Sequence, residues 1–313
     1  MHLIMILLGC TLAWISRQWG MEGWQRQLHW VDGEDPSSVA TSPSLPLPQS
    51  NPTTWGLTTR WRLTLGLFLS PPLWLATTAI AILWMGPVGE MVIPWEGLLS
   101  YGTILGICVL SGAVGLKLWW EGRQTLEQLQ HYPEITILGH NSRLLPYPLP
   151  YSAQVGFWQP HLVVTQGLLD TLDDQHLEAV LVHEQAHALS HDTFWFFWLG
   201  WLRRLTWWLP HTEFLWEELL MLRELRADHY AAQFTDPLLL AESLVILAAA
   251  PTSAFPIPVT MVAAFESPCP PNRLIQRLTA LISTPNDPPP ARANLLFGLL
   301  PSLLPLIMIP FHH

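Results

Sequence analysis

The chain has 313 residues, of which 50% are hydrophobic and only 12% charged, and its formal net charge at pH 7 is −10. So apolar a composition is typical of a protein partly dissolved in lipid rather than of a purely soluble enzyme. The negative charge and the few Lys and Arg residues argue against a nucleic-acid partner. Cys10, Cys108 and Cys269 lie far apart and form no CxxC pair, so neither a disulfide framework nor a thiolate zinc site is expected.

Four apolar segments, taken in chain order, are candidates for membrane helices. The first, residues 3–15, is short, but it lacks the positive start and small-residue cleavage site of a signal peptide, so an uncleaved helix is expected. The second and third, residues 63–86 and 98–120, each exceed the roughly 20 residues that cross the hydrocarbon core. The fourth, residues 293–311, follows the Pro-rich stretch TPNDPPP.

The charges between these segments predict an orientation. Arg17, Arg26 and Arg60 lie within or beside the Pro-rich linker that follows the first segment, whereas residues 87–97 contain two glutamates and no Lys or Arg. By the positive-inside rule the linker is cytoplasmic. Alternation then places the polar region after the third segment on the cytoplasmic side as well.

The stretch LVHEQAHALSHD in that polar region has the pattern of a metal site on a helix. Asp173 and the acidic residue after it supply N-cap chemistry, and apolar residues recur at helical spacing, which predicts a helix over about 174–190. His183 and His187 are four residues apart and share one face. Two imidazoles so placed can hold one zinc ion, and Glu184 is placed to take a proton from a zinc-bound water.

A third ligand is expected from a later helix. The continuation HExxHxxGxxH fails, because Ser190 stands where Gly is required and Thr193 where His is required. Further on, MLRELRADHYAAQ offers Glu224 and Asp228, four residues apart on one face. Glu224 can complete a two-His, one-carboxylate site, and Asp228 can accept the free ring N–H of a ligand histidine. The alternative for Glu224 is a surface ion pair with a neighbouring arginine.

HEQAH followed by ELRAD resembles the gluzincin metallopeptidases, in particular the integral-membrane ones of the HtpX/Ste24 and BlaR/MecR-antirepressor types. The resemblance covers about residues 135–281 and includes QVGFWQPHLVVTQGLL upstream and PPNRLIQRLTAL downstream. It implies one zinc per chain, bound by His183, His187 and Glu224, with Glu184 as the catalytic base. It also implies a protein or peptide substrate.

We therefore expect a mainly α-helical, multi-pass membrane protein with an α+β gluzincin (zincin) peptidase domain. Residues 1–120 form the membrane region, with about three helices and the Pro-rich linker at residues 20–60. Residues 121–292 form the zinc metallopeptidase domain on the cytoplasmic side, and residues 293–313 a last membrane helix. The expected partners are membrane lipid and a protein or peptide substrate, without nucleic acid.

Two rival functions stay open. One is a signalling antirepressor-type protease that cleaves a transcriptional regulator, and the other is a non-catalytic membrane scaffold. The intact Glu184 argues against the scaffold, because zinc binding does not require that residue. Strands near residues 135–138 and 162–165 are expected to pair with an extended substrate through main-chain hydrogen bonds.

Several further residues keep two interpretations. His191 is either another ligand or a helix-end residue, and the helix end is favoured; Asp192 is expected to cap the same turn. Arg277 either clamps the Glu224 helix or is a surface charge. Residues 193–209, TFWFFWLGWLRRLTWWL, form either a peptidase helix buried by aromatic packing or a helix at the lipid interface.

Overall fold

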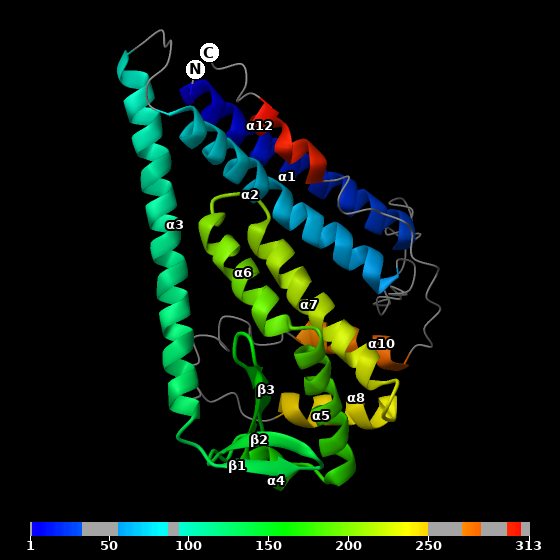
Figure 1. Ribbon diagram of the computed structural model, residues 1–313. Helices are drawn as coiled ribbons and strands as arrows, with labels where there is room; N and C mark the ends of the chain where they lie inside the picture. Colours follow the sequence, from blue (N-terminus) through cyan, green and yellow to red (C-terminus); the bar gives the residue numbers. More distant parts are fainter. Residues whose placement is uncertain (1, 33–55, 87–93, 250–270, 283–298, 308–313) are drawn as a thin grey trace. The chain divides into compact units, whose positions relative to one another are not determined.

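The computed structural model describes residues 2–32, 56–86, 94–249, 271–282 and 299–307 (Figure 1). The chain divides into two compact units, which are described separately. The first comprises Met1–Gly112, Leu205–Leu219 and Asn286–His313, and the second comprises Ala113–Arg204 and Leu220–Pro285.

Among the described residues, three helices contain segments long and apolar enough to cross a membrane: α1 (His2–Asp32), α2 (Leu57–Met85) and α3 (Pro94–Leu129). They contain the first and third predicted segments, and the second except for its last residue, Gly86, which follows the end of α2. α1 and α2 also extend into both ends of the range expected to be a linker, whose middle lies outside the described residues. α3 is one continuous helix whose C-terminal half belongs to the second unit.

The predicted fourth segment, residues 293–311, lies mostly outside the described residues. Its described part is a 3-10 turn, η2 (Leu300–Leu303), followed by the single helical turn α12 (Leu304–Ile307). The hydroxyl of Thr77 on α2 donates a hydrogen bond of 2.6 Å to the carbonyl of Ser302, so this turn packs on α2. Whether a full helix crosses the membrane here stays a prediction.

A buried arginine compensates for the prolines inside α2. Pro71 and Pro72 lie within the helix and have no backbone N–H to donate. The carbonyl of Phe68, four residues before Pro72, therefore lacks its helical donor. Arg17 of α1 is fully buried, and its Nη2 donates to that carbonyl at 3.3 Å. The contact ties α1 to α2 where the helical hydrogen bonding of α2 is interrupted.

The second unit contains a four-stranded sheet covered by helices (Figure 1). Its strands are β1 (Glu134–Ile137), β2 (His140–Leu145), β3 (Ser152–Val155) and β4 (His161–Thr165). The spatial order is β1-β2-β4-β3; β2 and β4 are parallel, and the other two pairs are antiparallel. β1 and β3 are therefore the edge strands.

This order corrects one expectation about the substrate. Residues 162–165 do form a strand, as predicted, but β4 pairs with β2 on one side and with β3 on the other. The prediction that this strand pairs with a substrate is wrong, because its main-chain donors and acceptors are already used. β3 is the edge strand next to β4, and it contacts α5.

Both faces of β4 are buried, in the alternation that a covered strand requires. Leu162 and Val164 pack against α4 (Gln166–Thr171) and α5 (Asp174–Leu189), while Val163 packs on the opposite face. α5 matches the predicted helix to within one residue at its C-terminal end.

Two glycines in the stretch QVGFWQPHLVVTQGLL hold the turns around β4. Gly156 has φ +140°, and a Cβ there would lie 2.6 Å from the carbonyl oxygen of Gln159. A Cβ on Gly167 would lie 2.1 Å from the carbonyl oxygen of Pro148. Any other residue would force the backbone apart at either position.

Four more helices complete the described part of this region: α6 (Asp192–Leu205), α7 (Thr212–Ala231), α8 (Pro237–Ala249) and α10 (Pro271–Ile282). α7 begins in the first unit and continues into the second at Leu220. Ala179 of α5, Ala231 of α7 and Leu240 of α8 share one buried cluster, with Leu281 of α10 packed on it. The C-terminal half of α7 is thereby held against α5.

Candidate metal centre

The sequence of α5 places three functional side chains on its buried side. The carboxylate of Asp173 accepts hydrogen bonds from the backbone N–H groups of Gln175 and His176, so the helix begins as predicted. His183, Glu184 and His187 are 7%, 8% and 9% exposed. A histidine or glutamate this deeply buried requires a polar partner.

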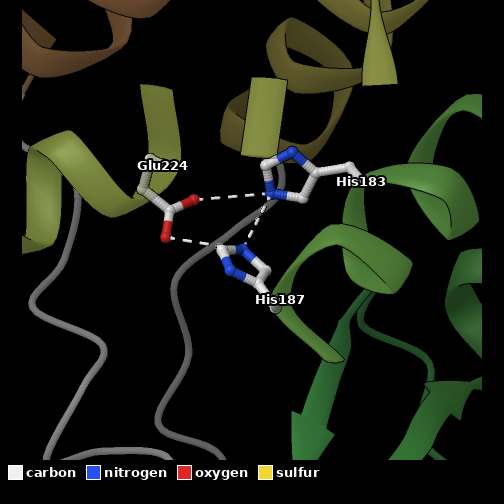
Figure 2. Close-up of side chains that lie close together, drawn as sticks. All are labelled: His183, His187 and Glu224. Atoms are coloured by element: carbon white, nitrogen blue, oxygen red, sulfur yellow. Dashed lines mark hydrogen bonds and ion pairs between the residues drawn. The ribbon is translucent and has the colours of Figure 1, made fainter. Parts of the chain in front are cut away.

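The side chains of His183, His187 and Glu224 converge on one point, with α5 supplying the histidines and α7 the carboxylate (Figure 2). The two Nε2 atoms are 3.2 Å apart. The Glu224 oxygens lie 3.5 Å from Nε2 of His183 and 3.7 Å from Nε2 of His187. In a tetrahedral zinc site with bonds of about 2.0–2.1 Å, ligand atoms lie roughly 3.3 Å apart. The donor set and its spacing therefore fit zinc.

Each histidine has a carboxylate at its other ring nitrogen. Nδ1 of His183 lies 2.9 Å from Asp228, and Nδ1 of His187 lies 2.8 Å from Asp192. A carboxylate in this position favours a proton on Nδ1 and leaves the lone pair of Nε2 for a metal.

Asp192 was predicted only to cap the turn. It reaches His187 because His191 has φ 51°, which turns the chain sharply between α5 and α6. His191 itself is exposed, in the helix-end position that its sequence favoured. A partner five residues along the chain is not a helical neighbour, so no helical spacing could have indicated Asp192.

Arginines hold the two carboxylates that α7 contributes to the centre, those of Glu224 and Asp228. Arg277 of α10 donates from Nε and Nη2 to the two oxygens of Asp228, both at 2.7 Å. Its Nη1 lies 3.3 Å from Glu224, which also accepts hydrogen bonds of 2.9 and 2.7 Å from Arg223. Arg277 is therefore the predicted clamp rather than a surface charge. For Glu224, both predicted interactions are present: it is paired with arginine and also faces the histidines.

These charges set the protonation of the centre without metal. Burial lowers the pKa of His183, but Asp228 and Glu224 outweigh burial and raise it to about 9. Burial raises the pKa of Glu224, but the charges of Arg223 and Arg277 hold it well below its usual value. The pKa of Asp228 is lowered in the same way, because Arg277 outweighs its burial. Both carboxylates are thus ionised at neutral pH.

Glu184 faces the sheet rather than the arginines. The hydroxyl of Ser152 on the edge strand β3 donates a hydrogen bond of 3.0 Å to Oε1 of Glu184. Ser152 is not among the predicted site residues, since it precedes Glu184 by 32 residues and no motif includes it. The hydrogen bond fixes the orientation of a carboxylate beside the two histidines, at the edge of the sheet.

Comparison with known proteins gives one finding. The family model of Peptidase family M48 matches residues 151–216. The matched part contains β3, β4, α5 with the HEQAH motif, and α6, and it ends before Glu224. No curated protein and no solved structure matches the chain. The match supports a metallopeptidase of family M48, a zinc-dependent family, and the His183–His187–Glu224 cluster supplies a set of donors for the metal.

Proposed function

We propose that the protein is a membrane-bound, zinc-dependent endopeptidase that hydrolyses peptide bonds. The observation that carries this proposal is the convergence of His183, His187 and Glu224 at the spacing of a tetrahedral zinc site. The similarity of residues 151–216 to family M48 supports it independently. With these three residues as its protein ligands, a bound zinc would have a fourth position for water or substrate, as in catalytic rather than structural zinc sites.

The residues around the centre have separate tasks. Bound zinc would supply Lewis acidity, polarising the substrate carbonyl and making water more acidic. The carboxylate of Glu184 takes a proton from the attacking water and delivers it to the leaving amine. Asp228 and Asp192 hold the two imidazoles in the tautomer that keeps Nε2 free. Ser152 keeps one oxygen of Glu184 in place.

The proposal extends to location and substrate. The three long apolar helices support a multi-pass membrane protein, and Arg26 and Arg60 in the predicted linker favour a cytoplasmic peptidase domain, whereas Arg17 is buried within α1. ELRAD in α7 together with these helices supports a place among the integral-membrane HtpX/Ste24-like and BlaR/MecR-like peptidases. Membrane-associated or juxtamembrane proteins are the proposed substrates, because an anchored active site meets them most often.

The test compares three forms of the full chain purified in detergent. Metal analysis should find one zinc per chain in the wild type and none in His187→Ala. Glu184→Gln should retain zinc but lose cleavage of an unfolded protein such as casein, because the base is not a ligand. Full zinc in His187→Ala would contradict the assigned centre. A wild type that binds zinc and cleaves nothing, even when reconstituted in lipid, would favour the scaffold function instead.

A further inference from the structure

The second unit carries a patch of exposed tryptophans. Trp158, between β3 and β4, is 74% exposed, and Trp195 and Trp198 on α6 are 57% and 41% exposed. Single exposed apolar side chains are ordinary, but a group of large aromatic ones marks a surface that contacts protein or lipid. These three residues are called the tryptophan patch below.

The patch is built on a packed aromatic base, so it is a formed surface. Phe157 is the centre of this base, with its ring 4.9 Å from that of Phe197, 5.1 Å from that of Trp158 and 6.3 Å from that of Trp198. Phe194 lies 4.9 Å from Trp158. Because Gly156 fixes the turn that precedes Phe157, the tryptophans are presented on a defined framework.

The same base packs against α3, a helix long and apolar enough to cross a membrane. Val114 and Leu118 of α3 share a cluster with Phe157, Phe197 and Trp201. The approach is close: a Cβ on Gly115 would lie 3.2 Å from Nε1 of Trp201. The tryptophan patch is thus packed, through its aromatic base, on the part of α3 from Val114 to Leu118.

The α3 residues that contact the aromatic base, from Val114 to Leu118, lie within the apolar run of α3, before its C-terminal end. The apolar run of α3 ends at Trp119 and Trp120, which are 42% and 58% exposed, and charged residues follow. Exposed tryptophans at the end of a membrane helix lie at headgroup depth. Val114 comes six residues before Trp120, which is about 9 Å along a helix. Helices that lie in the interface are buried to a comparable depth, about 5–10 Å.

We infer that the tryptophan patch is inserted into the interfacial layer of the bilayer, with lipid as its partner. Lys117 on α3 is exposed and makes only a long pair of 3.9 Å with Glu121, and Arg204 at the end of α6 is also exposed, so each element presents a cation that can reach lipid phosphates. This inference rests on the membrane location within the proposed function. It deepens the substrate class: Trp158 follows edge strand β3 by only three residues, so polypeptide segments lying on the membrane surface reach this strand directly.

The test measures depth at single spin labels on the full chain. Cys10, Cys108 and Cys269 are first replaced by Ala, and Trp158→Cys, Trp195→Cys or Gln175→Cys then provides the labelling site. Gln175 is the matched control, since it is exposed on the same unit but about 20 Å along α5 from the start of α6. The protein is reconstituted in phosphatidylcholine–phosphatidylglycerol vesicles, and relaxation by oxygen and by a water-soluble nickel chelate is compared.

We expect oxygen to relax the labels at 158 and 195 more than nickel does, and the reverse at 175. Equal behaviour at all three positions would overturn the inference, because the patch would then lie in water. Protection of 158 and 195 from both reagents would also overturn it, because a protein or a second copy would cover the patch. Zinc content and casein cleavage are measured on the same samples, so failure of the depth test is distinguishable from failure of the proposed peptidase function.

Discussion

At the scale of single residues, Asp228 and Asp192 lie 2.9 Å and 2.8 Å, respectively, from Nδ1 of a predicted zinc ligand, and Asp228 is also held by Arg277. Replacing either by Asn keeps the shape and removes the charge that orients the ring. We expect Asp228→Asn and Asp192→Asn each to weaken zinc binding roughly 10–100-fold, measured by competition with a chelator. A variant that binds zinc like the wild type would show that its carboxylate does not act on the metal centre.

Ser152 offers a test of how Glu184 is positioned. We expect Ser152→Ala to lower kcat roughly 10-fold, because small misplacements of a catalytic group are costly. KM and zinc content should stay unchanged, since Ser152 is neither a metal ligand nor part of the arginine clamp. Ser152→Thr keeps the hydroxyl and should restore most of the activity. Equal loss in the Ala and Thr variants would point to packing of β3 instead of the hydrogen bond.

The raised pKa of His183 predicts a pH dependence of zinc binding. With a pKa of about 9, His183 is protonated at neutral pH in the metal-free protein, and it must lose a proton to bind zinc through Nε2. Its contribution to affinity should therefore rise about tenfold per pH unit from pH 7 and level off near pH 9. Calorimetry in buffers of different ionisation enthalpy should detect the released proton. An affinity that does not change over this range would contradict the prediction.

The same shift affects the stability of the metal-free protein with the opposite trend. The folded pKa of His183 lies above the ordinary value of 6.5, so its pairing with Asp228 and Glu224 stabilises the fold fully below pH 6.5. That contribution should be lost as the pH rises through about 9. Urea unfolding of metal-free protein across this range measures it, and zinc-loaded protein serves as the control.

At the scale of elements, α10 is joined to α7 by buried charge. Arg277→Met would leave Asp228, which is 1% exposed, without its main counter-charge. Breaking a buried pair in this way costs about 3–5 kcal/mol, so a large drop in the free energy of unfolding is expected. Arg123→Met is the control, since it removes an exposed pair with Glu127 and a cation–π contact with the exposed Trp119, which together should cost at most about 2 kcal/mol. Similar losses in the two variants would contradict the clamp.

The elements also show how far local sequence could predict this fold. The helix carrying HEQAH and the strand at residues 162–165 were predictable, because capping, periodicity and short apolar runs are local signals. The order of the strands was not, since a short apolar run does not show which strands lie beside it. The apolar run of β4 therefore fits a substrate-binding strand as well as an inner strand, and only the sheet order shows that β4 lies between β2 and β3.

The residues of the candidate site also fall into those that local sequence predicts and those that it does not. Spacing alone indicated His183, His187, Glu224 and Asp228, because helical repeats bring residues four apart onto one face. Ser152 comes from another element, and Asp192 from beyond a left-handed turn. Such contacts depend on the tertiary fold, and no local pattern in a single sequence indicates them.

At the scale of the whole molecule, the cytoplasmic position of the peptidase domain is open to direct test. Single cysteines are placed at positions 92 and 175 in the cysteine-free chain and treated with a membrane-impermeant reagent in intact cells. We expect labelling at 92 and none at 175, because the predicted topology puts the acidic loop outside and the peptidase region, with the exposed Gln175, inside. Labelling at 175 after cell lysis is the control. The reverse pattern would invert the topology and exclude cytoplasmic repressors as substrates.

The arginine clamp also limits how the molecule can be dissected. The stretch similar to family M48 ends at residue 216, so a fragment cut to it would keep HEQAH but lack Glu224 and Asp228. Arg277 comes a further 49 residues after Asp228. The HEQAH motif is therefore not sufficient by itself: a fragment that keeps Ser152, the predicted zinc ligands and Arg277 must run from β3 to the end of α10.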